Sequence, residues 1–582
     1  MGSTISSDLL SATQIPVEVL NTAGIGDFLW PPQATLQDNA TYDYIVVGGG
    51  SAGCVVSRRL AESKSDSVLV LEAGGNPPLA AMIFSLFVLF PHSFVDYDYV
   101  STRDEYAARG QDNFTMITAG KMLGGSDSLN HFVHTRGIPK DYNNWAKMVG
   151  DESWRYENIL KYFVKSERLD DAEILRKYGE FHGTDGPMGI SRQPEQEVVN
   201  ILKAFAEVGN PTVLDLNANK TVGYSQSQFM YDNYKRQTPA YSYLTPIKDY
   251  ANLHVSTNTM VTRIIFEGNA AVGVEAINDG KRYTFRANKE IIMSAGVFNT
   301  PKLLMLSGIG PKDHLESFNI EVLQDLPVGE NLIDHVAVTV LHKLKQYIPV
   351  PNVPKAAVNF LRVPFPVLTS LVALNKSRTC PNYQTFNLFF QHDVPFVTPT
   401  CNTVFGLRNE ICDRWQKEVI SRDSLYSLLT LLQPKSRGVV RLSDTDPSAD
   451  PIITTGYYTK SDDLENMVTN VKDYITVGES SYFQQIGAEI AGLDLPACAE
   501  FEQGSDDFWK CYVLEHTTST YHFVGTSAMG QVVDSKLRVK GLEGIRVVDA
   551  SVMPNIVHGA PNAAVIMLAE KASDMIKNDN NN

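Results

Sequence analysis

Three glycines and one acid near the N-terminus have the types and the spacing of a site that binds phosphates. Gly48, Gly50 and Gly53 form the pattern G-x-G-x-x-G, and Glu72 follows them. In this pattern the first glycine allows a tight turn, the second lets a pyrophosphate approach the backbone, and the third lets a helix and a strand pack closely. An acid about 20 residues further on meets ribose hydroxyls, so the four residues predict a dinucleotide site. An acid rather than a basic residue favours FAD or NAD over NADP.

The sequence around the glycines supplies the elements that must position them. The apolar run 45–47 is typical of a parallel strand buried on both faces. Residues 52–62 predict a helix, whose N-terminus would present unpaired N–H groups and the positive end of its dipole to the phosphates. A second strand is predicted over 67–71 and ends at Glu72. The sequence therefore predicts the strand–turn–helix–strand unit of an α/β fold.

Length and charge limit the class of protein. At 582 residues the chain is too long for one compact core, so two or more domains are expected. A net charge of −16 argues against a nucleic-acid partner and against adhesion to an anionic membrane. The longest apolar run, Leu79 to Phe90, is shorter than the roughly 20 residues of a membrane span. It is interpreted as a buried helix or, alternatively, as an apolar wall of a substrate channel.

Cysteines and sequons point outside the cell. Cys54 lies in the predicted nucleotide helix, and the other five cysteines lie in the C-terminal third, at Cys380, Cys401, Cys412, Cys498 and Cys511. We expect a disulfide between Cys498 and Cys511, with two of the other three paired and one thiol left over. No cysteine or histidine spacing suggests a metal site. Four N-x-S/T sequons favour a secreted glycoprotein over a cytosolic protein with free thiols; they lie at Asn39, Asn113, Asn219 and Asn375.

The rest of the chain divides by its residue patterns. Residues 1–40 are predicted to form a helical N-terminal extension, and residues 141–210 to be mainly helical. Apolar and polar residues alternate over 253–294, which predicts strands. A turn and a short helix are expected over 325–335. The proline-rich stretch 336–515 is predicted to be the main body of a second domain.

Five blocks of sequence, taken in order, carry a resemblance to a known family. They are the G-x-G-x-x-G pattern with Glu72, then residues 120–130, 294–310, 328–335, and 521–526 with the C-terminal helix. Over nearly its whole length the chain resembles the glucose–methanol–choline (GMC) family of flavoproteins. The sequons and the lead-in Trp30–Pro31–Pro32 make the chain most similar to the insect branch of this family. That branch includes glucose dehydrogenase-like, ecdysone oxidase-like and aryl-alcohol oxidase-like members.

The resemblance implies a two-domain fold of the α/β class. The expected parts are a discontinuous Rossmann-like FAD-binding domain over 41–140, 211–335 and 521–582, and an α+β substrate-binding domain with an antiparallel sheet over 141–210 and 336–520.

The resemblance also implies FAD as the cofactor. The expected cofactor-binding residues are Gly48, Gly50, Ser51, Ala52, Gly53, Glu72, Gly120, Gly124, Gly125, Ser126, Asn130, Val261, Asp549, Ala550 and Asn562. The family position that carries a covalent flavin link in some members falls on Leu129, which cannot form one, so non-covalent FAD is expected. The positive end of the helix near Asn562 would lie by the flavin pyrimidine, where reduction leaves negative charge.

By the same resemblance, His522 is the catalytic base. Oxidation of an alcohol removes a hydroxyl proton and a hydride from one carbon; the flavin accepts the hydride, and a histidine suits the proton. Most relatives place a second His or Asn at a position that falls on Ala560 here, which has no hydrogen-bonding side chain. Either His558 or Asn562 substitutes, or His522 suffices with slower turnover, or the redox step is lost; we favour substitution.

Two further residues depart from the family pattern. Asp127 and His134 replace a small residue and an aromatic residue. Asp127 either brings negative charge close to the flavin, which would disfavour flavin reduction, or points outward to solvent.

The predicted function is FAD-dependent oxidation of a small-molecule alcohol, with oxygen or another electron acceptor. Apolar stretches at 79–90 and 356–374 favour an apolar alcohol, such as a steroid of the ecdysteroid class. The alternatives are a sugar dehydrogenase, a redox-silent flavoprotein lyase such as a hydroxynitrile lyase, and a non-catalytic flavin-binding protein.

Overall fold

The computed structural model describes residues 29–580, apart from 193, 197, 234, 348–366, 377–378 and 393–395. The first part of the predicted N-terminal extension, residues 1–28, therefore lies outside the described residues. The same holds for the apolar residues 356–366, whereas residues 367–372 form a strand.

The first of two large sheets carries the predicted nucleotide unit. Its strand order is β11 (Leu253–Ser256), β2 (Val68–Leu71), β1 (Ala40–Val47), β14 (Lys281–Met293), β13 (Ala270–Asn278) and β12 (Thr259–Glu267), with β25 (Ile545–Val547) beside β14. β1 runs parallel to both β2 and β14, while β12, β13 and β14 pair antiparallel. The buried apolar runs of β1 and β2 form this parallel centre, which confirms the predicted α/β class.

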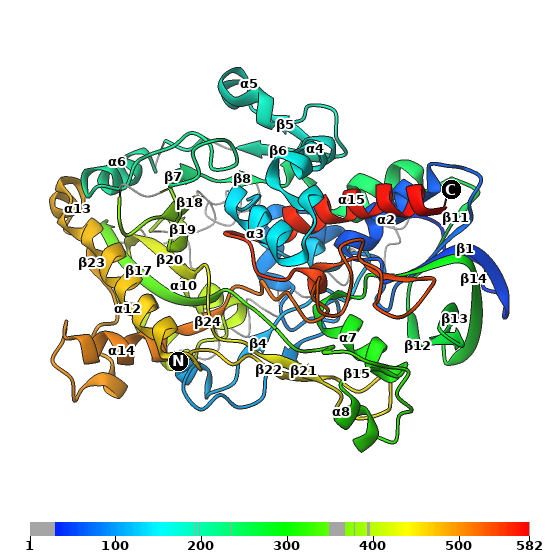
Figure 1. Cartoon of the computed structure of the whole chain (residues 1–582). Helices are drawn as coiled ribbons and strands as arrows, with labels where there is room; N and C mark the ends of the chain where they lie inside the picture. The colour runs from blue at the N-terminus through cyan, green and yellow to red at the C-terminus, as the bar shows by residue number, and fades with distance from the viewer. Residues whose placement is uncertain are drawn as a thin grey trace.

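Helices cover this sheet and join the two ends of the chain. Helix α2 (Ser51–Ala61) follows β1 directly, and the C-terminal helix α15 (Asn562–Asn580) packs against it (Figure 1). Helix α4 (Tyr156–Ser166) packs on α15 in turn. The aromatic residues of α3 (Pro139–Val149) and α4 belong to the same hydrophobic core as β1. Part of the segment 141–210, predicted for the second domain, thus packs on the first.

The second large sheet is antiparallel, as expected of the substrate domain. Its strand order is β23 (Glu489–Ile490), β17 (Val336–Gln346), β20 (Arg422–Leu431), β19 (Tyr383–Phe390), β18 (Val367–Val372) and β7 (Gly223–Gln226), with β24 (Thr517–Ser519) beside β17. β7 comes from the segment 211–335 that was predicted for the FAD-binding domain, yet it pairs with β18. Figure 1 shows this sheet at the opposite end of the molecule from β1 and α2. The exact domain boundaries stay a prediction.

The remaining described helices and strands lie outside the two large sheets. The other α-helices are α5 (Ala172–Tyr178), α6 (Val199–Glu207), α7 (Gly296–Leu306), α8 (Lys312–Ser317), α10 (Val397–Pro399), α11 (Asn409–Glu418), α12 (Ser461–Ile475), α13 (Ser481–Ile486) and α14 (Asp506–Glu515). The other strands are β3 (Tyr99–Val100), β4 (Met116–Ile117), β5 (Glu167–Asp170), β6 (Met188–Arg192), β8 (Gln228–Phe229), β9 (Tyr231–Asp232), β10 (Lys235–Arg236), β15 (Ile309–Gly310), β16 (Gln324–Asp325), β21 (Val439–Arg441) and β22 (Ile452–Thr454).

Two predicted helices do not form as expected, although Phe87 of the first lines the cavity described below, in line with the alternative interpretation as a channel wall. The run Leu79 to Phe90 forms two 3-10 turns, η2 (Leu79–Met82) and η3 (Phe84–Leu89), because Ile83 between them is extended at φ −101° and ψ 121°. Residues 325–335 form no helix, since Gly329 and Asn331 take left-handed φ values of 82° and 59°. None of the described helices is long and apolar enough to cross a membrane.

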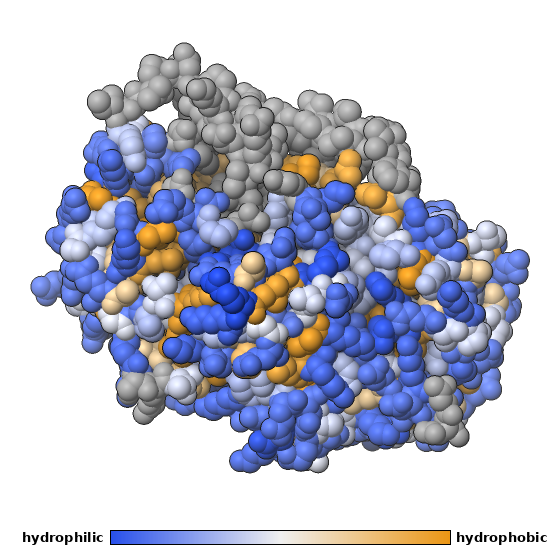
Figure 2. All heavy atoms as spheres, turned by 90° about the horizontal axis from the view of Figure 1, so that it is seen from above, coloured by the Kyte–Doolittle hydropathy of each residue, from blue (hydrophilic) through white to orange (hydrophobic). Residues whose placement is uncertain are grey.

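The cysteines pair as the sequence suggested. Disulfides join Cys498 to Cys511 and Cys401 to Cys412, which leaves Cys380 as the remaining thiol of the C-terminal third. Three of the four sequon asparagines are exposed, and Asn113 is half-buried. The face shown in Figure 2 is mostly hydrophilic, with hydrophobic residues gathered in small separate groups.

Candidate active site

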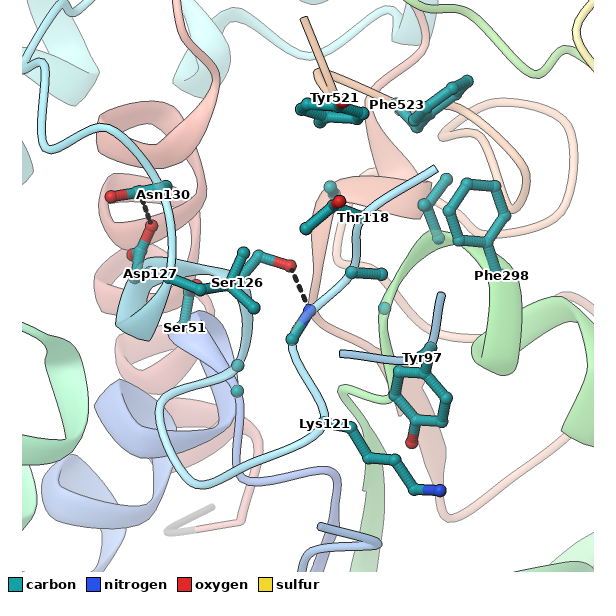
Figure 3. Close-up of a pocket in the computed structure, with 18 of the residues that line it drawn as sticks. Ser51, Tyr97, Thr118, Lys121, Ser126, Asp127, Asn130, Phe298, Tyr521 and Phe523 are labelled. Atoms are coloured by element: carbon teal, nitrogen blue, oxygen red, sulfur yellow. Dashed lines mark hydrogen bonds between the residues drawn. The ribbon is translucent and has the colours of Figure 1, made fainter. Parts of the chain in front are cut away.

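A cavity of about 640 Å³ is lined by residues from both large sheets. The first sheet and its loops contribute residues 47, 48, 50–52 and 71–73, and the second contributes Phe386, Leu388 and Leu428. Figure 3 shows the part of its wall where the loop that holds Ser126 and Asp127 meets Ser51. The cavity brings together most of the predicted cofactor residues, namely Gly48, Gly50, Ser51, Ala52, Glu72, Gly120, Gly125, Ser126, Asn130, Val261, Asp549, Ala550 and Asn562.

The first glycine loop has the geometry that a pyrophosphate needs. Gly48 has φ 98°, and a Cβ on it would lie 2.4 Å from the Ser294 carbonyl oxygen. A Cβ on Gly53 would lie 1.9 Å from the Gly48 carbonyl oxygen, so Gly53 serves packing and does not line the cavity. Around Gly50, in contrast, the nearest atom to such a Cβ is 3.8 Å away. The space beside Gly50 is therefore open to a ligand, as the sequence pattern predicts.

A second glycine loop packs directly on the first. The Gly124 N–H donates to the Gly49 carbonyl at 2.7 Å, and a Cβ on Gly125 would lie 2.8 Å from the Gly50 Cα. Gly124 does not itself line the cavity. The Ser126 hydroxyl accepts from the Gly120 N–H at 3.1 Å (Figure 3). Backbone thus meets backbone here, which explains why the block from 120 to 126 is glycine-rich.

Three helices begin at the cavity wall. The first residues of α2, α7 and α15, which are Ser51, Gly296 and Asn562, all line the cavity. Gly50 precedes α2 without a side-chain cap, so the first N–H groups of that helix remain available to an anion. Helix N-termini carry partial positive charge, and the uncapped start of α2 makes this part of the cavity suitable for a phosphate-bearing cofactor.

The acid at the end of β2 lies where the pattern places it. Glu72 lines the cavity, and its carboxyl oxygens accept from the N–H groups of Gly49 and Gly74, each at 2.8 Å. Burial raises the pKa of Glu72 to about 7, although both backbone donors oppose this. Asp549 also lines the cavity, but it accepts from the Gly296 N–H at 2.9 Å and from the Ser551 N–H at 2.8 Å. Its carboxylate therefore fixes the loop at the cavity wall, and its predicted contact with the cofactor stays a prediction.

The orientation of His522 can be derived from its hydrogen bonds. His522 lines the cavity, and its Nδ1 lies 3.0 Å from Nδ1 of His335. Nε2 of His335 lies 3.1 Å from the Leu432 carbonyl oxygen, which can only accept, so Nε2 carries the proton. Burial lowers the pKa of His335 to about 3, so this ring is neutral and its Nδ1 is an acceptor. His522 must therefore donate from Nδ1, which leaves its Nε2 unprotonated.

The environment of His522 keeps this ring neutral as well. Burial, with His335 and His131 nearby, holds the pKa of His522 well below its usual range. The backbone N–H of His522 donates to Asp334 at 2.8 Å, and the Ser519 hydroxyl donates to the same carboxylate at 2.6 Å. Nε2 of His522 has no hydrogen-bond partner among the described residues. It is the atom available to a bound molecule.

The loop before α15 separates the two proposed substitutes for a second catalytic group. Ala560 and Asn562 line the cavity, whereas His558 does not. Nδ1 of His558 lies 2.5 Å from Asp141, outside the cavity wall. The amide of Asn562 donates to the Met230 sulfur at 3.3 Å, and its oxygen accepts from the Ala563 N–H. Asn562 is therefore placed to contact a ligand in the cavity, whereas His558 is not.

Asp127 points inward rather than to solvent. It is buried, lines the cavity and accepts from Asn130 at 2.8 Å (Figure 3). Burial raises the pKa of Asp127 to about 6, while the charge of Arg236 opposes the shift. The Arg236 guanidinium donates to the Asn130 carbonyl at 2.9 Å and lies over the ring of Phe132. A buried cation therefore accompanies the extra carboxyl group.

Sequence reasoning missed His131 and the positioning role of His335. His131 lines the cavity, and its ring meets the edges of Phe87 and Phe405. Burial lowers the pKa of His131 to about 4, so it is neutral. Its place directly after Asn130 was the available signal. The role of His335 depends on a contact with His522 across 187 residues, which no local pattern shows.

The chain is similar to known oxidoreductases over most of its length. The sequence profiles of GMC oxidoreductases match residues 42–337 and 434–569. The chain belongs to the GMC oxidoreductase family. It is 37% identical to an ecdysone oxidase of Bombyx mori, over 94% of this chain and 83% of the relative. It is 32% identical to a glucose dehydrogenase [FAD, quinone] of Drosophila melanogaster, over 92% and 87% of the two chains.

Solved structures agree with this assignment. A formate oxidase of Aspergillus oryzae, studied for modification of its FAD, aligns with TM-score 0.80 and 25% identity over 94% of this chain and 100% of that one. A pyridoxine 4-oxidase of Mesorbium loti aligns with TM-score 0.78 and 26% identity over 92% and 98%. The family membership confirms the predicted resemblance, the FAD cofactor and the class of reaction. The chain is an FAD-dependent oxidoreductase that acts on alcohol groups.

Proposed function

We propose that this protein oxidises an apolar alcohol of steroid size, with His522 as the base that accepts the hydroxyl proton. The observation that carries the proposal is the unprotonated Nε2 of His522 in a cavity whose wall is apolar on the side of the second sheet. That wall consists of Phe87, Val133, Val367, Phe386, Leu388, Val404, Phe405 and Leu428. The relatives named ecdysone oxidase point to the same substrate class.

The wall argues for an apolar alcohol over a sugar. A sugar presents several hydroxyls, and each one needs a hydrogen-bond partner when it leaves water. Most of the wall instead comes from apolar side chains of β18, β19, β20 and the segment 400–405. A rigid apolar ring system with one reacting hydroxyl fits this chemistry.

The residues of the chain divide the work of the reaction. FAD, when bound, accepts the hydride from the alcohol carbon. We assign its phosphates to Gly50, Ser51 and the start of α2, and its ribose to Glu72. Nε2 of His522 takes the hydroxyl proton because Nδ1 is held as the donor to His335. Asp334 fixes the backbone of His522, and the contact with His335 fixes the orientation of its ring.

The proposed substrate class is tested by a flavin-reduction screen under nitrogen. Purified holoenzyme is mixed with ecdysone, cholesterol, benzyl alcohol and glucose, and bleaching of the flavin is followed. We expect the apolar alcohols to bleach the flavin at rates well above glucose. Bleaching by glucose alone would establish a sugar dehydrogenase instead, which is the activity named for the Drosophila relative. A flavin that stays oxidised while mandelonitrile releases cyanide would establish a lyase.

We further propose that the protein is a secreted glycoprotein. The two disulfides and the exposed sequon asparagines Asn39, Asn219 and Asn375 support this location. Treatment with peptide-N-glycosidase of protein from an insect-cell medium should lower its mass. An unchanged mass, or protein retained inside the cells, contradicts the proposal. The flavin-reduction screen, repeated in air, decides between oxygen and another electron acceptor: oxygen as the acceptor returns the bleached flavin to its oxidised form.

A further inference from the structure

A second group of reactive side chains lies outside the cavity wall, around the unpaired cysteine. Cys380 precedes β19 and is partly exposed, whereas the other free cysteine, Cys54, is buried in α2. The Cys380 sulfur lies 4.0 Å from Nε2 of His558, and the ammonium of Lys140 lies 3.5 Å from the same sulfur. Three separate segments of the chain thus meet at one thiol. None of the three side chains lines the cavity described above.

The imidazole in this group is held by a buried acid. Asp141 is buried in the first turn of α3, and its Oδ1 lies 2.5 Å from Nδ1 of His558. The other oxygen of Asp141 accepts from the backbone N–H of His558 at 2.8 Å. The carboxylate therefore fixes the ring with Nδ1 toward Asp141 and Nε2 toward Cys380. A nucleophile, an imidazole and an orienting acid in this order form the arrangement that activates a thiol.

Charge favours the thiolate form at this position. Burial opposes a charged imidazole, but Asp141 outweighs burial and raises the pKa of His558 to about 9. His558 is then a cation at neutral pH, and exposed Lys140 adds a second positive charge beside the sulfur. The hydrogen bond from His558 holds the pKa of the Cys380 thiol below its usual range, against a smaller opposing effect of burial. A thiolate, unlike a thiol, is a nucleophile.

We propose that Cys380, His558 and Asp141 form a thiol–disulfide exchange site for small disulfides. The Cys380 thiolate attacks one sulfur of R–S–S–R, forms a new bond between Cys380 and that sulfur, and breaks the original S–S bond. The second R–S group leaves as a thiolate and takes its proton from solvent. The small disulfide is the oxidant, and no flavin chemistry takes part. The two protein disulfides stay intact, since all four of their cysteines are buried.

The experiment measures exchange with dithiodipyridine, a small aromatic disulfide whose released thione absorbs light. The rate of thione release from native holoenzyme is measured at several pH values between about 6 and about 8.5. Over this interval the thiolate fraction of an ordinary thiol rises from roughly 0.3% to about half, so its rate rises roughly 150-fold. We expect one thione released per chain and a rate that rises clearly less over the interval than the rate of an ordinary thiol. Mass spectrometry should place the adduct on the peptide that holds Cys380.

Variants separate this site from an accidental surface thiol. Cys380→Ser should abolish the release, while Cys54→Ser should leave it unchanged. His558→Gln should restore the steep pH dependence of an ordinary thiol, with bound FAD as the check that the fold is intact. Exposed Lys140→Met, which leaves the buried pair in place, should slow exchange several-fold at about pH 6. An ordinary pH dependence in the unmodified protein, or an unchanged profile in His558→Gln, would overturn the proposal.

Discussion

His335 is expected to control catalysis without contacting the substrate. It is buried, accepts from Nδ1 of His522 and donates to the Leu432 carbonyl. His335→Leu removes the acceptor, so His522 loses the contact that fixes its tautomer and its ring orientation. A buried hydrogen-bonding group left without its partner costs about 1–3 kcal/mol. Since about 1.4 kcal/mol corresponds to tenfold in rate, flavin reduction should slow roughly 5- to 150-fold.

A matched variant separates orientation from packing. In His335→Asn the side-chain oxygen takes nearly the place of Nδ1, so it can still accept from His522 and should recover much of the lost rate. His522→Ala removes the base itself and should cost about 100- to 10,000-fold. The assay is stopped-flow bleaching of the flavin under nitrogen, with the alcohol that reacts fastest in the screen. Equal rates for His335→Leu and the unmodified protein, at equal FAD content, would refute the reasoning.

Three other predictions concern the cofactor and stability. Gly53→Ala would place a Cβ 1.9 Å from the Gly48 carbonyl oxygen, so flavin absorbance per chain should fall at least about tenfold, while Gly179→Ala, with nothing within 4 Å, should keep it. Acid precipitation should release all of the flavin, because Leu129 offers no atom for a covalent bond; flavin retained in the pellet contradicts this. The His558 ion pair should stabilise the fold by up to about 3 kcal/mol below pH 6.5 and lose this as pH rises through about 9, since its folded pKa is raised. Denaturation curves of the unmodified protein and His558→Gln, compared at about pH 6 and about pH 10, check this last prediction: their difference should shrink at the higher pH.

The sequence predicts the nucleotide half of the site well because its physics is local. Gly48, Gly53 and Glu72 act through one turn, one helix and two neighbouring strands, whose spacing is fixed by backbone geometry. The partner of His522 could not be predicted, since His335 reaches it only after β17 and β24 have paired. The direction of Asp127 was equally open from sequence, because a short 3-10 turn, η5 (Gly125–Ser128), decides which way it points.

The proposed base and the first cofactor loop are attached to different sheets. His522 follows β24, and its backbone is tied to Asp334, two residues before β17, whereas the first glycine loop leaves β1 of the other sheet. Loading with flavin and turnover of alcohol are therefore separable properties of this molecule. Local unfolding confined to the β17–β24 edge would leave a protein that still binds flavin but does not oxidise alcohol. Flavin absorbance alone is therefore a poor measure of active enzyme in any preparation.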